Sequence, residues 1–264
     1  MLKIENVHKT FNPGTINENY VLKGLELHLN PGDFVTVIGG NGAGKSTMLN
    51  SVAGVFPVDK GKIIINGKDV TKLPEYKRAS IIGRVFQDPM VGTAANMSIQ
   101  DNMALALRRG EKRTLRWGVT NKECDKYKEL LKILDLGLEN RLTDKVGLLS
   151  GGQRQALTLL MASLKKPDIL LLDEHTAALD PKTATKVLEV SEKIVYENKL
   201  TTMMITHNMK DAITHGNRLI MMNSGKVVLD IKGEDKNKLT VNDLLEKFAV
   251  AAGEEFTSDS ALLG

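Results

Sequence analysis

A glycine-rich run near the start of the chain carries the residue types that hold a phosphate chain. Its pattern fits G-x-x-x-x-G-K-[ST], in which glycines let backbone N–H groups turn toward phosphates and a lysine reaches the terminal phosphates. A purely structural glycine turn is the alternative, and the register of glycines, lysine and hydroxyl after an apolar run disfavours it. The run consists of Gly39, Gly40, Asn41, Gly42, Ala43, Gly44, Lys45 and Ser46, followed by Thr47. It predicts binding of a nucleoside triphosphate, with the Ser46 hydroxyl placed for Mg²⁺.

An acidic pair follows another apolar run further along the chain. Asp173 and Glu174 come directly after the run I-L-L-L at residues 169–172. Asp173 is suited to hold Mg²⁺ through water, and Glu174 is the candidate general base for an attacking water. Such a pair can also simply begin a helix, because carboxylates favour helix N-termini. The phosphate-binding run in the same chain favours the catalytic interpretation.

A second glycine-containing motif, the LSGGQ run, covers Leu149 to Gln153. Its S-x-x-Q spacing is that of a helix capping box. Capping alone does not explain the two glycines, since each costs about 1 kcal/mol relative to alanine in a helix interior. Two bare positions at a helix N-terminus would let a phosphate approach closely. Because the chain already has one phosphate loop, we expect the LSGGQ run to serve the ATP of another subunit, in a head-to-tail dimer with two shared sites.

Three short apolar runs predict buried parallel strands that place this chemistry. Phe34–Ile38 leads into the phosphate loop, residues 169–172 lead to the acidic pair, and residues 201–206 lead to His207. Open α/β sheets bind their ligands at the carboxyl ends of such strands, so we expect the three groups at one edge. Other expected elements are strands at 2–7, 20–29 and 62–66, a hairpin of 218–222 with 227–231, a helix from Ser150 to before Pro167, and a helix at about 240–249.

Composition narrows the class of protein. The chain has 264 residues, 42% of them hydrophobic and 26% charged, which is ordinary for a globular protein. No apolar stretch approaches the ~20 residues that cross a bilayer, and the start lacks the apolar block of a signal peptide. The single cysteine, Cys124, cannot form an internal disulfide. We therefore expect a cytoplasmic protein.

The net charge of +4 comes partly from a basic stretch at residues 108–117. One interpretation is a patch for nucleic acid or phospholipid headgroups. The alternative, which we favour, is a solvated loop anchored to its own domain by Leu115 and Trp117. We expect no nucleic-acid partner.

The order of these motifs resembles the ATP-binding cassette (ABC) ATPase subunit over some 220 residues. That resemblance implies a P-loop NTPase core with a mixed sheet, an antiparallel β subdomain and an inserted α-helical subdomain. It implies one ABC ATPase domain over residues 1–250, with a RecA-like core at about 1–87 and 166–250, a helical subdomain at about 88–165, and a flexible tail at 251–264. His175 stands where the family commonly has proline, and we expect it to be a structural neighbour of Glu174.

The resemblance also implies roles for individual residues. Gln87 matches the glutamine loop that touches Mg²⁺ or its water, and Asp180 matches the loop that crosses to the partner subunit. His207 matches the histidine that contacts the γ-phosphate and positions the catalytic water. Phe11 stands where the family stacks an aromatic on adenine, with a plain core position as the alternative. The implied set is completed by catalytic Lys45, Glu174 and His207, by nucleotide contacts from Ser150, Gly151, Gly152 and Gln153, and by Mg²⁺ held near Ser46, Gln87 and Asp173.

As a whole, the resemblance implies the ATPase of a transporter that works through separate integral membrane permease subunits, on the inner face of the cell membrane. A free-standing ATPase of this size is similar to the import type, with an extracytoplasmic solute-binding protein in the full system. The stretch F-N-P-G-T at Phe11–Thr15 and the basic insertion are similar to bacterial ATPases paired with a permease and a lipoprotein receptor for aromatic amino acids. The alternative is a soluble ABC ATPase of iron–sulfur cluster assembly, which has the same motifs.

Overall fold

A computed structural model describes residues 1–111 and 118–252 of the chain. The chain divides into two compact units, the first formed by residues 1–78 together with the segment from residue 200 onward, and the second formed by residues 79–199. The predictions for Leu115, Trp117 and most of the tail concern residues outside these described ranges. None of the described helices is long and apolar enough to cross a membrane.

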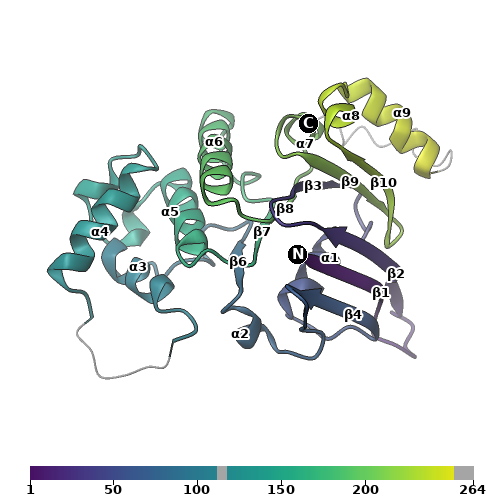
Figure 1. Ribbon diagram of the computed structural model, residues 1–264, viewed down its shortest axis with the longest axis horizontal. Helices are drawn as coiled ribbons and strands as arrows, with labels where there is room; N and C mark the ends of the chain where they lie inside the picture. The colour runs from purple at the N-terminus through teal and green to yellow at the C-terminus, as the bar shows by residue number, and fades with distance from the viewer. Residues whose placement is uncertain (112–117, 253–264) are drawn as a thin grey trace. The chain divides into compact units, whose positions relative to one another are not determined.

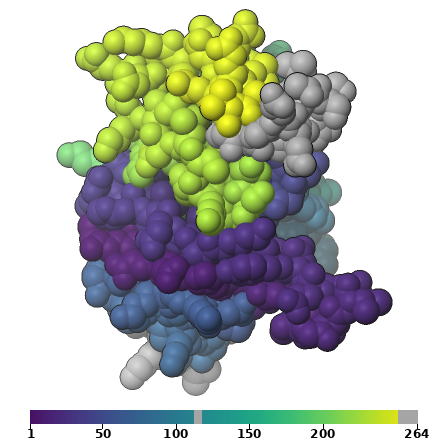
Figure 2. All heavy atoms as spheres, turned by 90° about the vertical axis from the view of Figure 1, so that its right-hand side faces the viewer, coloured from purple at the N-terminus to yellow at the C-terminus, as the bar shows by residue number. Residues whose placement is uncertain are grey.

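The first unit begins with a four-stranded antiparallel sheet in the order β2-β1-β4-β5 (Figure 1). Its members are β1 (Leu2–Phe11), β2 (Asn19–Leu29), β4 (Lys60–Ile65) and β5 (Lys68–Asp69). Alternating apolar side chains of β1 and β2 form one buried face, as expected for a sheet with one solvated side. Residues 12–18, between β1 and β2, are exposed and project from the surface (Figure 2). The antiparallel region expected from the sequence is confirmed.

The same unit contains a mixed sheet built around β3 (Phe34–Ile38), whose five residues are all buried. β3 runs parallel to β8 (Thr202–Ile205) on one side and to β9 (Arg218–Asn223) on the other. β10 (Lys226–Lys232) pairs with β9 in an antiparallel hairpin. α1 (Lys45–Ala53) follows β3 through the phosphate loop.

Short helices complete the first unit. Arg78 of α2 (Glu75–Arg78) is fully buried and donates to the carbonyls of Ser51 and Val52, which closes the C-terminal end of α1. α7 (Met209–Thr214), α8 (Glu234–Asn237) and α9 (Val241–Ala252) gather beside β9 and β10 (Figure 1). Leu244 and Phe248 of α9 pack into one cluster with Ile38, the last residue of β3. The C-terminal helix therefore buttresses the strand that carries the phosphate loop.

The second unit combines a parallel strand pair with helices. β6 (Ile82–Val85) runs parallel to β7 (Ile169–Asp173), with Val85 opposite Leu172. α5 (Gly151–Ser163) packs against α6 (Pro181–Asn198) and also contacts α3 (Ile99–Leu107) and α4 (Asn121–Lys132). Two single 3₁₀ turns, at 138–140 and 146–148, lie between α4 and α5. The expected helical insertion before Asp173 is confirmed.

Among the strands that differ from the sequence-based expectation, β1 and β6 have a clear physical reason. β1 continues four residues beyond Val7, to Phe11. Its pairing with β2 shifts register at several points and Asn6 has a φ of +47°, so bulges break the alternation that would have marked the longer strand. β6 was not expected at all, because four residues that include Gly83 and Arg84 give no periodic signal.

Candidate nucleotide site

The phosphate loop begins where β3 ends and closes at the start of α1. Gly42 and Gly44 have φ values of +77° and +97°, in the left-handed region that glycine enters without strain. Gly44 is the N-cap of α1 and makes no side-chain cap bond, so the first-turn N–H groups of that helix can face an anion. Lys45 is 5% exposed, and its ammonium donates to the carbonyls of Gly39 (2.6 Å) and Gly40 (3.1 Å). The lysine thus lies inside the curve of its own loop.

The phosphate loop is supported by the turn between β9 and β10. The N–H of Gly225 donates to the carbonyl of Ala43 at 3.1 Å, and the N–H of Lys23 donates to the carbonyl of Gly225 at 3.3 Å. A side chain on Gly225 would collide with the carbonyl of Val21. The sequence indicated a hairpin at this point but gave no sign that its turn holds the phosphate loop. Only the tertiary contact reveals that role.

His207 lies at the same edge of the sheet as the phosphate loop. Because β3 and β8 are parallel neighbours with Val37 opposite Ile205, their carboxyl ends lie side by side. His207 is exposed there. The next residue, Asn208, caps α7 by accepting from the N–H groups of Lys210 and Asp211 at 2.9 and 3.2 Å. His207 is therefore the residue immediately before the N-cap of α7.

Phe11, the candidate adenine-stacking residue, lies at the end of β1. Its ring meets Phe56 edge-on, with ring centres 5.2 Å apart. The Lys9 ammonium lies 5.4 Å from the Phe11 ring centre and forms an ion pair with Asp59. Phe11 is partly exposed, so it combines a packed edge with a face that is open in part. This arrangement fixes the ring orientation without burying the ring.

In the second unit, the acidic pair ends β7. Asp173 is partly exposed, and its Oδ2 lies 3.5 Å from a guanidinium nitrogen of Arg84. Glu174 has a φ of +47°, a left-handed conformation that is uncommon for residues other than glycine and is concentrated at functional sites. His175 is buried, with its Nε2 3.0 Å from the hydroxyl oxygen of Ser191 in α6. It is held in the interior beside Glu174.

Gln87 follows β6 at the same edge of the strand pair as Asp173. It is exposed, whereas its neighbour Phe86 is held by the Gln155 side-chain amide, which donates to the Phe86 carbonyl at 2.9 Å. Gln155 is fully buried in α5. The guanidinium of Arg84 lies 4.4 Å from the Phe86 ring centre. The helix that carries the LSGGQ run therefore also positions the start of the glutamine loop.

The LSGGQ run forms the N-terminus of α5. A complete capping box is present, in which the Ser150 hydroxyl accepts from the Gln153 N–H and the Gln153 side chain accepts from the Ser150 N–H, both at 3.2 Å. The N–H groups of Gly151 and Gly152 belong to the helix positions that have no intrahelical partner. Capping and anion binding are thus compatible here, because they use different groups.

Arg154 supports the LSGGQ run through hydrogen bonds to backbone carbonyls. This side chain is 8% exposed and donates to the carbonyls of Val146 (3.3 Å), Gly147 (3.1 Å) and Leu149 (3.1 Å). It also contacts the sulfur of Met90. No sequence pattern predicted this role, because an arginine in a helix is usually a surface residue.

Asp180 is the N-cap of α6, and its carboxylate accepts from the N–H of Thr183 at 3.1 Å. Hydrogen bonds from the Thr183 hydroxyl and backbone hold the pKa of Asp180 below its ordinary value. The carboxylate is thus ionised at neutral pH and fixed at the helix start.

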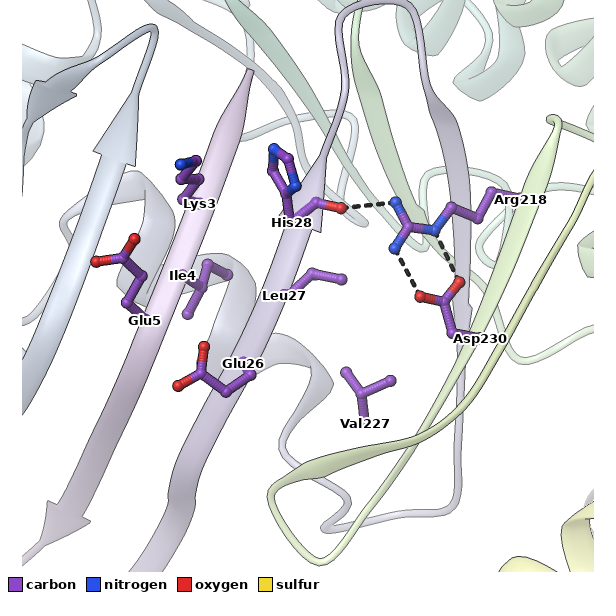
Figure 3. Close-up of a pocket in the computed structure, with 9 residues that line it drawn as sticks. All are labelled: Lys3, Ile4, Glu5, Glu26, Leu27, His28, Arg218, Val227 and Asp230. Atoms are coloured by element: carbon purple, nitrogen blue, oxygen red, sulfur yellow. Dashed lines mark hydrogen bonds and ion pairs between the residues drawn. The ribbon is translucent and has the colours of Figure 1, made fainter.

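A separate depression of about 410 Å³ lies among β1, β2, β9 and β10 (Figure 3). Arg218 lines it and donates to both carboxylate oxygens of Asp230 and to the His28 carbonyl, all at 2.6–2.8 Å. It also pairs with Asp33 at 3.0 Å. The bonds to Asp230 are the main reason that the pKa of Arg218 is raised. This network ties the antiparallel sheet to the mixed sheet, so its role is structural.

The family model described as ABC transporter matches residues 22–177, a span that contains the phosphate loop, the LSGGQ run and the acidic pair. This chain belongs to the ABC transporter family. It is accordingly an ATP-binding cassette protein and an ATPase. The P-loop NTPase fold class expected from the sequence is confirmed.

Relatives and solved structures agree with this assignment. The tyrosine transport ATP-binding protein of Clostridioides difficile (strain R20291) is 46% identical over 252 residues, which is 95% of this chain and 100% of that protein. A spermidine/putrescine import ATP-binding protein of Spiroplasma citri is 35% identical over 86% of this chain, which spans 60% of that protein. A dimeric ATP-binding cassette in a post-hydrolysis state, bound to ADP and phosphate, is 30% identical with a TM-score of 0.74, over 88% of this chain and 98% of that one.

Proposed function

We propose that this ABC ATPase energises import of a small solute, of the amino-acid type, through separate membrane permease subunits. The observation that carries the proposal is the 46% identity to a tyrosine transport ATP-binding protein over that protein's whole length. The polyamine importers, which are matched over 60% of their length in the Spiroplasma example, support import as the direction. The names of these relatives favour transport over the alternative of iron–sulfur cluster assembly.

In the proposed site, the phosphate loop binds the β- and γ-phosphates through its N–H groups and the α1 N-terminus. Lys45 exchanges its bonds to the Gly39 and Gly40 carbonyls for bonds to phosphate oxygens. Phe11 stacks on adenine with its partly open face. These roles use groups that the first unit already holds in place.

The residues present fit a magnesium ion. Ser46 offers an exposed hydroxyl on the first turn of α1, Asp173 offers a partly exposed carboxylate, and Gln87 offers an exposed amide oxygen. Such a small set of oxygen donors, completed by phosphates and water, is what Mg²⁺ prefers in proteins. When bound, Mg²⁺ would neutralise charge that develops on the phosphates.

Glu174 would accept a proton from the attacking water, and His207 would orient that water by a hydrogen bond. Glu174 is partly exposed, and its left-handed backbone follows directly on the end of β7. His207 stands exposed beside the phosphate loop at the same sheet edge. Both residues therefore have the accessibility that acid–base work requires.

A second copy of the chain completes the proposed site. The Gly151 and Gly152 N–H groups, with Ser150 and Gln153, would face the γ-phosphate of the partner's ATP, and Asp180 would cross to the partner. The relative that is dimeric in a post-hydrolysis state bound to ADP and phosphate supports the dimer in this proposal. We propose that the dimer sits on the inner face of the cell membrane, bound to the permease, with an extracytoplasmic solute-binding protein in the full system.

Two experiments test the proposal. Glu174→Gln is expected to retain ATP binding, lose turnover and accumulate an ATP-bound dimer in size-exclusion chromatography; an active, monomeric variant would contradict the mechanism. A mild-detergent pull-down of tagged protein from its own cells, followed by mass spectrometry, is expected to recover a polytopic membrane protein. Recovery of soluble cluster-assembly proteins without a permease would instead support the alternative.

A further inference from the structure

The glycines of the LSGGQ run lie against the neighbouring helix and the turn before it. α5 and α6 approach so closely that a Cβ on Gly152 would overlap the methyl group of Thr183. A Cβ on Gly151 would come within 3.3 Å of Leu179, in the turn that precedes α6. Gly152 is buried, whereas Gly151 is exposed. The space that Gly152 leaves open is therefore occupied by Thr183.

Besides its contact with Gly152, Thr183 interacts with the carboxylate of Asp180. The Asp180 carboxylate accepts from the backbone N–H of Thr183 at 3.1 Å, and hydrogen bonding from the Thr183 side chain contributes to the lowered pKa of Asp180. Thr183 is β-branched, so its methyl and hydroxyl are fixed relative to each other and turn together about one bond. Turning the methyl away from Gly152 would therefore carry the hydroxyl off Asp180.

We infer that Thr183 is a positioning residue that links the LSGGQ run to the Asp180 loop within one subunit. The inference rests on the proposed function, in which these two elements serve the partner's ATP. A shift of the α5 N-terminus would press on the Thr183 methyl, and the hydroxyl would pass that shift to the carboxylate. Glycine is needed at position 152 because Thr183 occupies the space, while the Gly152 N–H stays available to phosphate.

The two substituents of Thr183 can be removed separately. Gly152→Ala should lower ATP turnover about tenfold or more, because the new methyl overpacks the helix contact. Adding Thr183→Ser to it deletes the threonine methyl but keeps the hydroxyl, so the double variant should return to within about threefold of the Thr183→Ser variant. Thr185, which is exposed on the same helix, provides the matched control. Adding Thr185→Ser to Gly152→Ala should restore nothing.

Thr183→Val tests the second half of the link, since valine keeps the shape and removes the hydroxyl. It should lower kcat about threefold or more and leave the KM for ATP unchanged, because only the Asp180 carboxylate is released. Thermal unfolding supplies a readout independent of activity. Alanine is a better helix former than glycine, so Gly152→Ala should raise the melting temperature only when Thr183→Ser is also present.

The outcomes are distinct. If the Gly152→Ala/Thr183→Ser double variant remains as slow as Gly152→Ala, the ligand rather than Thr183 requires the glycine, and the inference is wrong. Wild-type turnover in Gly152→Ala or in Thr183→Val would also overturn it. Failure of the proposed function would show up elsewhere, as ATP turnover that survives Glu174→Gln.

Discussion

Replacing Gly225 by alanine should weaken ATP binding, although Gly225 belongs to a hairpin turn outside every nucleotide-binding motif. Ser224 and Gly225 have φ values of +48° and +79°, the signature of a type I′ turn. The Gly225 N–H holds the Ala43 carbonyl of the phosphate loop, and a Cβ at this position would run into the Val21 carbonyl. The turn must therefore move, and the phosphate loop is bonded to it.

The expected magnitude has two parts. A left-handed conformation costs a non-glycine residue about 1–2 kcal/mol. Overpacking against a fixed backbone carbonyl adds about 1–3 kcal/mol. If about 1 kcal/mol of the second part is relieved by displacing the phosphate loop, the Kd for ATP rises about fivefold.

The chain offers a matched control for the conformational part. Asn66 and Gly67 form another turn with nearly the same angles, +48° and +77°, and a Cβ on Gly67 would meet nothing within 4 Å. Gly67→Ala should therefore lose only about 1–2 kcal/mol of unfolding free energy and keep wild-type ATP affinity. Urea unfolding and titration calorimetry with ATP, both on Gly225→Ala and Gly67→Ala, measure the two quantities. Equal stability loss and equal ATP affinity in the two variants would refute the reasoning.

Three further predictions concern polar groups that are buried or partly buried. Lys236 is fully buried and donates to the carbonyls of Ile213, His215 and Gly216 at the end of α7; Lys236→Met should cost about 3 kcal/mol in urea unfolding, and a loss below about 1 kcal/mol would contradict this role. Burial raises the pKa of Asp211. Folding therefore favours the protonated form of Asp211, and the stability that this contributes is present at low pH and lost as the pH rises through the folded-state pKa. Asp211→Asn should accordingly raise the melting temperature at pH 7 but not below about pH 4. An equal gain in melting temperature at both pH values would rule this out. Arg154→Met should weaken ATP-dependent dimer formation in the Glu174→Gln background while ATP binding by the monomer stays normal, and unchanged dimerisation would show that the LSGGQ run does not need this support.

The strands that lead to the phosphate loop and to the acidic pair, β3 and β7, could be predicted from sequence because each consists mainly of consecutive apolar residues, a pattern that indicates burial. β3 has the predicted bounds, since five consecutive buried residues end at a glycine that begins the loop. β7 differs by one residue, Asp173, which is the last strand residue as well as the first acidic one. The predicted strand at β1 ended too early, because bulges interrupt its alternating pattern, and β6 was not predicted. In both cases pairing with a neighbour, rather than local pattern, makes the strand.

The LSGGQ run shows where sequence reasoning stops. Its capping box was visible in the spacing of Ser150 and Gln153, and the structure contains it. The glycines suggested open space for a ligand. The structure adds a second reason for Gly152, namely Thr183, which lies 31 residues further along the chain on another helix. A spacing pattern records that a side chain is absent but not which neighbour uses the space.

The supporting residues that sequence could not reveal share one physical logic. Gln155, Arg154 and Gly225 each bond a backbone carbonyl in a motif or next to one, at Phe86, Leu149 and Ala43 respectively. Motif side chains such as Gln87 must stay exposed in order to meet nucleotide, so they cannot be fixed by packing of their own. Their position is set instead through the backbone that carries them, from donors in the interior or in an adjoining turn. Substitution of a support should therefore change how often the site is correctly arranged, and it should leave the chemical groups themselves intact.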